Sequence, residues 1–406
     1  REASCQFCGA ICCPGFLWAL DCDSKFLDAV ANFALASPDS WQSEKMKVLF
    51  LTRYGPLGAS SRYRFFQYLP WFERAGMDCH VSPLFDDSYL RYFYRTKTRR
   101  LTDVARAFLR RLVVLVRAGC YDLIVIEKEL IPYFPAWIEG FLKTIGVPYI
   151  VDYDDATFHL YDRHLNPLVR YIFKNKIAKV MRHATVVVAG NQYLANYAIM
   201  AGAAKVEIVP TVIDLECYAI QNEDVAFRES DGVFTIGWIG TPATAKYLEV
   251  IAPALRAICA NGSARLRLIG SGPVDIPGVQ VEVLEWSKDR EVEYMQTFDV
   301  GIMPLPDEPW ERGKCGFKLI QYMACALPVI ASPVGVNVDI VLHGQNGFLC
   351  KTNDDWVSAC RLLMKDADLR MRMGTAGRKL AEEKFSVQAQ HERLINILLE
   401  AVKVSV

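Results

Sequence analysis

The chain has 406 residues, of which 52% are hydrophobic and 23% are charged. This composition is too apolar for a disordered chain and suits a globular protein with about two hydrophobic cores. Its apolar runs are short and interrupted by Arg, Lys or Asp, so none reaches the roughly 20 residues of a membrane-spanning helix. Lys plus Arg and Asp plus Glu are equal at 46 each, which excludes the overall basic excess of a dedicated nucleic-acid binder, and we expect no nucleic-acid partner.

Residues 1–45 differ from the rest of the chain in their cysteine content. Five of the 13 cysteines fall within the first 22 residues, and the others are scattered singly. Scattered cysteines among apolar neighbours favour reduced thiols and a cytoplasmic protein over a disulfide framework. The pair in CQFC has zinc-ligand spacing but lacks a second well-spaced pair, so we expect no metal site. We expect 1–45 to be an appended or leader segment, with the protein itself beginning at Met46.

From Met46 onward, short β-branched runs alternate with helical patterns, which predicts βαβ units and parallel sheets. In the first half we expect strands near 47–52, 78–82, 122–126, 148–151, 185–189 and 206–209, with helices near 61–75, 100–118, 131–145, 164–182 and 192–201. A polar stretch at 216–232 is the expected linker. In the second half we expect strands near 233–239, 264–269, 281–285, 299–304 and 328–332, with helices near 244–260, 288–297, 316–325, 353–365 and 386–402.

This alternation predicts an α/β protein with two Rossmann-like, doubly wound domains whose strand ends face a cleft. The expected N-terminal domain spans 46–212, and the expected C-terminal domain spans 213–385. The last segment, 386–406, is expected to form a helix that packs back towards the N-terminal domain.

The first strand runs into the glycine-bearing segment TRYGPLGASSRYRFF. Gly58 suits a tight turn, and Ser60 or Ser61 is expected to cap the following helix. Arg62 and Arg64 would then lie in its first turn, where a cation is unfavourable unless a negative group sits nearby. One interpretation is a site for an anionic acceptor group, and ordinary surface arginines are the other.

Positive charge is concentrated in the first half. Residues 46–210 carry 23 Lys plus Arg against 14 Asp plus Glu, whereas residues 211–406 carry 20 against 26. Residues 91–117 hold nine basic residues and a single acid, Asp103, and end in an amphipathic helical pattern. Such a face can lie on anionic headgroups, which would place the protein peripherally at the inner membrane face. A solvated helix face explains the pattern equally well.

The segment VDYDDATFH follows another strand of the first half and supplies Asp152, Asp154, Asp155 and His159. We favour hydrogen bonding to the acceptor by Asp154 or Asp155. Helix capping is the alternative, and a metal site is the least favoured of the three.

The second half opens with the strand and turn TIGWIGTPATAK. Gly240 ends the strand, Thr241 follows, Thr244 is the expected N-cap, and Lys246 would lie in the first helical turn. An ammonium beside a helix N-terminus can hold a phosphate. The segment is neither a Walker loop nor a Gly-x-Gly-x-x-Gly loop, which argues against nucleoside triphosphatases and dehydrogenases.

Two further glycine turns follow strands of this half. LIGSGP places Gly270 and Gly272 where the backbone could approach a base or ribose, although a plain tight turn would need them as well. In residues 309–335, a loop with Gly313 and Gly316 leads into a helix whose free amides could hold a diphosphate or a sugar. Lys318 and Gln321 are expected on one face of that helix. A core helix with incidental polar residues is the alternative.

Together these segments resemble the retaining GT-B glycosyltransferases of the large group-one family, family four, over essentially all of residues 46–400. The resemblance is carried by KVLFLTRYGPLGASSR, VEIVPTVID, GWIGTPATAKYL, LIGSGP, FDVGIMPLP, GFKLIQYMACALPVIASPVG and HGQNGFL, in that order. The block GKCGFKLIQYMA is similar to that of a bacterial subgroup. The resemblance implies sugar transfer, with retention of configuration, from a nucleoside diphosphate sugar held by the C-terminal domain. The acceptor, a glycan or a lipid-linked molecule, would be held by the N-terminal domain, and no metal or other cofactor is required.

The sequence departs from the family at three motif positions. Lys246 lies at the diphosphate-binding lysine, but Thr241 lies where an arginine usually assists. Gly313 and Gln321 occupy the two positions of the family's Glu-x7-Glu motif, so both glutamates are missing. An amide can still bond ribose hydroxyls, although more weakly than a carboxylate.

The resemblance implies an electrostatic mechanism in which cations and amides stabilise the leaving diphosphate. We expect Lys318 to replace the missing arginine and Glu311 to replace the first glutamate. Lys246 and Lys318 are the expected catalytic cations, assisted by the amides of Gly316 and Phe317. The expected donor-binding residues are Gly240, Thr241, Thr244, Gly270, Gly272, Gly313, Cys315, Gly316, Phe317 and Gln321, and the expected acceptor-side residues are Gly58, Ser60, Ser61, Arg62, Arg64, Asp154 and Asp155.

Two other functions fit the same fold. A non-catalytic nucleotide-sugar-binding protein would explain the substituted motif positions, and it would bind the donor without consuming it. A nucleotide-sugar epimerase would need an acid/base set between the domains, and the sequence offers none that is convincing.

Overall fold

The computed structural model describes residues 45–96, 98–219 and 232–403. The expectations for residues 1–44, including the cysteine cluster, lie outside the described residues, as does most of the expected linker.

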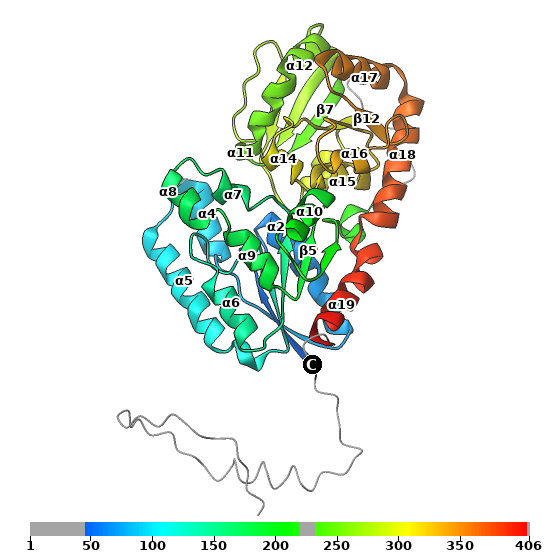
Figure 1. Ribbon diagram of the computed structural model, residues 1–406. Helices are drawn as coiled ribbons and strands as arrows, with labels where there is room; N and C mark the ends of the chain where they lie inside the picture. Colours follow the sequence, from blue (N-terminus) through cyan, green and yellow to red (C-terminus); the bar gives the residue numbers. More distant parts are fainter. Residues whose placement is uncertain (1–44, 97, 220–231, 404–406) are drawn as a thin grey trace, which may run out of the picture. The chain divides into compact units, whose positions relative to one another are not determined.

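Six parallel strands form the N-terminal sheet in the order β2-β1-β3-β4-β5-β6 (Figure 1). They are β1 (Met46–Leu51), β2 (Met77–Val81), β3 (Leu123–Glu127), β4 (Tyr149–Tyr153), β5 (Val186–Ala189) and β6 (Val206–Ile208). Every residue of β3, β4 and β5 is buried, as expected of a parallel sheet covered on both faces. The six strands expected in this half are confirmed.

Helices cover both faces of the N-terminal sheet. One face packs against α5 (Leu101–Val116), α6 (Trp137–Thr144), α9 (Lys176–His183) and α10 (Gln192–Met200), whose buried residues share one core with the strands. The other face packs against the 3-10 turn Phe66–Tyr68 and the helices α3 (Leu69–Arg74) and α19 (Val387–Lys403). Near the strand ends lie α2 (Ala59–Arg64), α4 (Asp87–Thr96), α7 (His159–Asp162) and α8 (Pro167–Phe173).

The C-terminal sheet is also parallel and has the order β12-β11-β10-β7-β8-β9. Its strands are β7 (Phe234–Ile239), β8 (Ala264–Ile269), β9 (Val281–Leu284), β10 (Val300–Met303), β11 (Val329–Ala331) and β12 (Gly347–Leu349). On one face lie α12 (Ala252–Cys259) and α17 (Asn353–Lys365), and on the other lie α13 (Glu291–Met295) and α15 (Phe317–Ala324). The remaining helices are α11 (Pro242–Ala245), α14 (Pro309–Arg312), α16 (Asn337–Ile340) and α18 (Ala367–Lys384).

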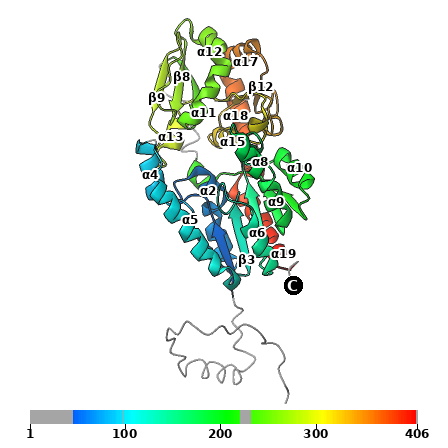
Figure 2. The ribbon, with the colours of Figure 1, turned by 60° about the vertical axis from the view of Figure 1, so that its left-hand side comes forward.

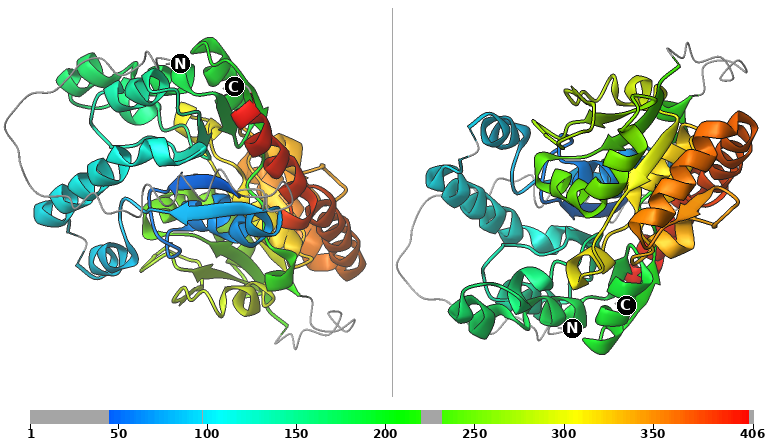
Figure 3. Two further views of the ribbon diagram at one scale, coloured as in Figure 1. Left: turned by 90° about the horizontal axis from the view of Figure 1, so that it is seen from below. Right: turned by 90° about the horizontal axis from the view of Figure 1, so that it is seen from above.

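The two last helices of the described residues are α18 and α19, and a helix was expected only for the second of them. Helix α18, the longest among the described residues, was not predicted; it packs closely on α15 and the turn after it, because Gly377 faces Met323 and Gly374 approaches the carbonyl of Ala326. After it, α19 crosses to the N-terminal sheet, where Leu394, Ile397 and Leu398 are buried in that sheet's core. In Figure 3, α18 and α19 follow one another in orange and red. None of the helices in the described segments combines the length and apolarity that a membrane crossing requires.

Candidate active site

The turn after β1 differs from its expected form. Gly58, not a serine, takes the N-cap position of α2. Ser60 and Ser61 lie two and three residues further along and donate their hydroxyls to the buried carboxylate of Glu127, at 2.9 and 2.6 Å. A side chain at Gly58 would collide with Tyr54, because an added Cβ would lie 2.4 Å from the Cβ of Tyr54. The expected serine cap is therefore wrong, and the serines link α2 to the end of β3.

Arg64 is neither a surface residue nor available to an anionic ligand. It is buried, its Nε and Nη2 bond both oxygens of Asp152, and its Nη1 donates to the carbonyl of Val209. Burial lowers the pKa of this guanidinium, but the charge of Asp152 outweighs burial and raises it. The acceptor role expected for Arg64 is replaced by an internal ion pair between α2 and β4.

Arg62 points towards the C-terminal sheet. Its guanidinium lies 4.6 Å from the ring centre of Tyr63 and 5.4 Å from that of Trp286. Tyr63 donates its hydroxyl to Glu291 of α13 at 3.0 Å, and its ring centre lies 4.1 Å from that of Phe317 at the start of α15. Figure 2 shows α2 beneath α13 and α15. The first loop of the N-terminal half thus contacts the second half directly.

Three charged residues that the sequence analysis did not single out extend this site. Glu127, Lys128 and Glu129 end and follow the buried strand β3, and all three are buried. Lys128 adopts a positive φ of 64°, which directs its ammonium to Asp154 at 2.7 Å and Asp155 at 3.5 Å. Three consecutive charges after an apolar strand are the signal that could have identified them, because the strand ends of a parallel sheet meet at one edge.

Asp154 and Asp155 lie at the carboxyl end of β4, as expected, but each already has a cation. Burial raises the pKa of Asp154, but the Lys128 charge and bonds from Lys128 and Ser60 lower it to about 2. Asp155 is more exposed and also lies 3.8 Å from the ammonium of Lys314 in the glycine loop before α15. The metal interpretation of this segment finds no support, since no metal-ligating cluster of three His, Cys, Asp or Glu occurs among the described residues.

At the second glycine turn, Thr241 takes the N-cap position that was expected for Thr244. The backbone amide of Thr241 donates to the Thr244 hydroxyl at 3.2 Å, so Thr244 closes a capping box instead. Lys246 follows the last residue of this short helix rather than lying in its first turn. It is exposed, and its ammonium lies 5.5 Å from the ring centre of Tyr247.

The turns after β7 and β8 lie side by side. Gly270 has a φ of +72°, and a Cβ there would lie 2.6 Å from the carbonyl oxygen of Gly240. Gly272 has a φ of +66° and packs beside Pro242. Glycine is required at both positions by backbone conformation, which is consistent with the simpler of the two interpretations of LIGSGP.

The loop before α15 is docked on the N-terminal half. The Asn191 amide nitrogen donates to the carbonyls of Gly313 and Lys314, both at 3.0 Å. Cys315 is buried in the N-terminal core, and its thiol donates to the carbonyl of Asp154 at 2.8 Å. The side chain of Cys315 therefore contacts the N-terminal domain. Of this residue, only the backbone is left to contact the nucleotide sugar.

Gln321 is placed differently from Lys318, although both were expected on one face. Gln321 is buried, and its amide nitrogen donates to the hydroxyl of Tyr218 at 2.9 Å. Glu311 is also buried and accepts a hydrogen bond from the hydroxyl of Tyr247. Both side chains thus have partners within the protein, which weakens their expected roles as substitutes for the motif glutamates.

Three ammonium groups lie against two aromatic rings of the C-terminal half. Lys246 and Lys314 lie 5.5 and 5.9 Å from the ring centre of Tyr247, and Lys318 lies 5.3 Å from that of Trp238. Burial, and then the neighbouring charge of Lys314, lower the pKa of Lys318 to about 8. Among the acids of the described residues, the one within ion-pair distance of any of these three lysines is Asp155, 3.8 Å from Lys314. The cluster is suited to a multiply charged anion, because such a ligand would relieve the repulsion.

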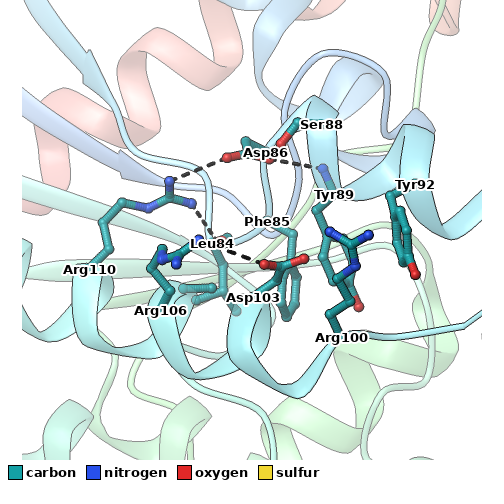
Figure 4. A pocket seen from close by; sticks show the side chains of 11 residues that line it. Leu84, Phe85, Asp86, Ser88, Tyr89, Tyr92, Arg100, Asp103, Arg106 and Arg110 are labelled. Carbon is teal, nitrogen blue, oxygen red and sulfur yellow. Dashed lines mark hydrogen bonds and ion pairs between the residues drawn. The ribbon is translucent and has the colours of Figure 1, made fainter.

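Two cavities lie in the N-terminal half. One of about 290 Å³ lies between α4 and α5, where Arg110 bonds Asp86 and the Leu84 carbonyl, and Arg106 pairs with Asp103 (Figure 4). The other, of about 240 Å³, is bordered by Gly58 and Ser60 of the first loop and by aromatic side chains that include Phe93, Tyr94 and Tyr133. The second cavity adjoins the serines that bond Glu127, on the side where the acceptor is expected, and it is called the acceptor-side cavity below.

The sheets, their order and the neighbours in known structures define a GT-B fold. HepE from Anabaena, solved in complex with UDP, superposes with a TM-score of 0.66 at 17% identity over 87% of this chain and 100% of that chain. Sucrose-phosphate synthase from Thermosynechococcus elongatus superposes with a TM-score of 0.65 at 14% identity over 89% of this chain and 100% of that chain. The expected fold class is confirmed.

Sequence comparison shows which proteins the C-terminal half is similar to. Residues 233–366 match the model of the family described as glycosyl transferases group 1. N-acetyl-alpha-D-glucosaminyl L-malate synthase of Bacillus anthracis is 27% identical over 163 residues, which cover 37% of this chain and 42% of that protein. The capsular polysaccharide biosynthesis glycosyltransferase CapM of Staphylococcus aureus is 27% identical over 169 residues, covering 40% and 44%. The chain thus matches less than half the length of these curated relatives.

Proposed function

We propose that this protein is a glycosyltransferase that moves a sugar from a nucleoside diphosphate sugar to a glycan or lipid-linked acceptor, with retention of configuration. The observation that carries the proposal is the placement of Lys246 and Lys314 against the ring of Tyr247 and of Lys318 against the ring of Trp238, with Lys314 and Lys318 on either side of the start of α15. Three ammonium groups and free helix amides form a site of the kind that binds a diphosphate. The HepE structures in complex with UDP and UDP-glucose, and the curated glycosyltransferase relatives, support the same class of donor.

In the proposed reaction the bond between the sugar and the β-phosphate breaks, and the diphosphate leaves with an added negative charge. Lys246 and Lys318, with the backbone amides of Gly316 and Phe317, would stabilise that charge. Lys314 joins them in the proposal because it lies in the same cluster. The acceptor hydroxyl then attacks the face from which the diphosphate departs, and its proton passes to the leaving phosphate.

We place the acceptor at the edge where Ser60, Asp154 and Asp155 meet the loop before α15. Asp154 receives bonds from Ser60 and Lys128, and its backbone carbonyl accepts from Cys315. The reacting sugar would therefore be held between the lysine cluster and this acidic edge. The 240 Å³ cavity bordered by Ser60 provides room for the acceptor beyond the reacting hydroxyl.

We also propose a cytoplasmic location, because the eight cysteines of the described residues are free thiols.

Thermal unfolding with a panel of nucleoside diphosphates and their sugars tests the donor proposal. We expect one base to stabilise the protein strongly, and Lys246→Ala to weaken its binding by about 1.5–3 kcal/mol, the range for a hydrogen bond to a charged group. Lys365→Ala at the far end of α17 is the matched control and should leave affinity unchanged. Titration calorimetry gives the affinities, and equal losses in both variants would contradict the site.

Consumption of the donor tests the chemistry itself. With a suitable acceptor, or water as a slow substitute, the stabilising nucleotide sugar should be converted to its nucleoside diphosphate. Binding without any conversion across glycan and lipid-linked acceptors would identify the protein as a binder and overturn the enzymatic proposal.

A further inference from the structure

Helix α5 carries an apolar stripe that faces away from the protein. Leu101, Leu109, Leu112 and Val116 expose 83, 63, 43 and 86% of their surface, and Ala105 is exposed between them. Their spacing places all five on one side of a helix. The opposite side, with Ala107, Arg111 and Leu115, is buried against the sheet. A helix that already buries one apolar face does not need a second apolar face to fold.

Helix α6 continues the exposed apolar surface with aromatic side chains. Phe134, Trp137, Phe141 and Ile145 recur at helical spacing, and Trp137 is 74% exposed. The ring centres of Phe134 and Trp137 lie 6.3 Å apart. Helices α5 and α6 cover the same face of the N-terminal sheet, because Leu115 and Leu142 belong to one core (Figure 1).

Helix α8 adds a third exposed segment next to the second. It has no buried residue, and Leu165, Leu168, Tyr171 and Ile172 around it are all exposed. Phe173 at its end contacts Tyr133, which directly precedes Phe134, with 6.4 Å between ring centres. Of the 24 large hydrophobic side chains exposed among the described residues, 15 lie between residues 94 and 172. The clustering is therefore specific to this part of the surface.

The charges that border this apolar surface are mostly positive. Arg106, Arg110 and Arg117 form the band next to the α5 stripe, and Lys143 is an exposed cation of α6. Asp103 is the one acid in the α5 sequence, and it pairs with Arg106. Exposed aliphatic and aromatic side chains suit the boundary between headgroups and acyl chains, and the bordering cations suit the anionic headgroups.

We propose that α5, α6 and α8 form a docking surface for an anionic lipid bilayer. The aliphatic and aromatic side chains would insert between the headgroups, and Arg106, Arg117 and Lys143 would contact lipid phosphates. A protein partner would need a matching set of acidic side chains to neutralise this band of cations. The headgroups of an anionic bilayer can neutralise all of them at once. The proposal does not depend on the transfer reaction.

The acceptor-side cavity borders the same surface. Its lining includes Val104 and Phe108 of α5, and Pro132 and Tyr133 before α6. If the proposed function holds, a lipid-linked acceptor could extend from the bilayer through this cavity towards Ser60. This consequence rests on the proposed function, and the docking surface itself does not.

Vesicle flotation of the full chain tests the docking surface without any activity measurement. Vesicles of phosphatidylcholine alone are compared with vesicles containing about 30% phosphatidylglycerol at low and high salt. We expect binding to the anionic vesicles and loss of most of it at high salt. The variant Arg106→Gln/Arg117→Gln/Lys143→Gln should bind about 100-fold more weakly, since each of the three cations near the surface contributes roughly fivefold.

The apolar contribution is tested with Trp137→Ser/Phe141→Ser, which should also lose at least about tenfold in affinity. The matched control, Leu362→Ser/Met371→Ser, removes exposed apolar side chains from the C-terminal half and should bind as the parent does. Brominated lipids should quench the fluorescence of Trp137, and the folded variant Trp137→Phe should lose that quenching.

The proposal would be overturned if the parent protein bound neither kind of vesicle. It would also be overturned if the control Leu362→Ser/Met371→Ser lost as much affinity as Trp137→Ser/Phe141→Ser. A concentration-dependent dimer in sedimentation, which Trp137→Ser/Phe141→Ser converts to a monomer without vesicle binding, would assign the surface to a second copy of the chain instead.

Discussion

Lys318 is held in a setting that opposes its charge. Burial and the nearby ammonium of Lys314 lower its pKa to about 8, while Asp155 only partly offsets them. A diphosphate placed beside Lys318 would favour the charged form and raise the pKa again. The protonation of this single residue is therefore coupled to occupancy of the proposed donor site.

The coupling predicts how binding depends on pH. Below about pH 8, Lys318 is protonated with and without ligand, so affinity for the preferred nucleoside diphosphate should be flat. Above that value, binding must take up a proton, and affinity should fall. Calorimetry at pH 8.5 in two buffers of different ionisation enthalpy measures the uptake. The variant Lys318→Met should show weaker binding without this dependence, and an unchanged slope in it would assign the proton elsewhere.

At the scale of residues, the sequence predicted the local turns better than the side-chain partners. The glycine turns could be predicted because their signals are local, whereas Lys246 lies after the short helix in whose first turn it was expected. The bond from Arg64 to Asp152 spans 88 residues and the bond from Tyr63 to Glu291 spans 228, so no local pattern shows either. Gln321 and Glu311 were assigned to the ligand because their burial against Tyr218 and Tyr247 depends on tertiary packing.

Among the elements, the strands were predicted well and the helices less well. Buried parallel strands are continuous apolar runs, which a sequence displays directly. The helix expected over 131–145 begins only at Trp137, after Pro132 and Pro135. Helix α18 was missed because its apolar residues are sparse and two glycines interrupt them, yet Gly374 and Gly377 provide its close contacts with Ala326 and Met323.

The start of α15 offers a test at this scale. Gly316 has a φ of +65°, and a Cβ there would lie 2.3 Å from the Cδ1 of Ile340. We expect Gly316→Ala to cost about 1–2 kcal/mol from backbone strain, with a further loss from the collision, and to weaken diphosphate binding. Gly344→Ala is the control, because its φ is +79° with nothing within 4 Å of the added Cβ. Urea unfolding compares them, and equal effects would show that the collision is relieved without cost.

In the whole molecule, the two halves meet through close contacts around the loop before α15. Gly313 packs against Ala156, Asn191 bonds the loop carbonyls, and Cys315 is buried in the N-terminal core. The loop that belongs to the proposed donor site is therefore fixed to the half that holds the proposed acceptor site. Reacting groups on the two substrates gain from such positioning, since an error of about 1 Å can cost about 100-fold in rate.

Gly313→Ala tests this contact. The φ of Gly313 is −82°, so alanine is not strained there, but its Cβ would lie 2.5 Å from the Cβ of Ala156. We expect the rate of transfer to fall by up to about 100-fold, while stabilisation by nucleoside diphosphate persists. Gly119→Ala adds a methyl with no neighbour within 4 Å and should change neither. Loss of nucleotide stabilisation in Gly313→Ala would show damage to the donor site itself.

The return of α19 to the first sheet has a consequence for biosynthesis. Phe50, Phe72 and Ile150 share a core with Leu394, Ile397 and Leu398, which the ribosome adds more than 200 residues later. The first sheet therefore leaves the exit tunnel with one apolar side uncovered and stays so while the whole second sheet is made. A nascent chain in this state is a natural client for chaperones, and premature termination before α19 would leave a product prone to aggregation.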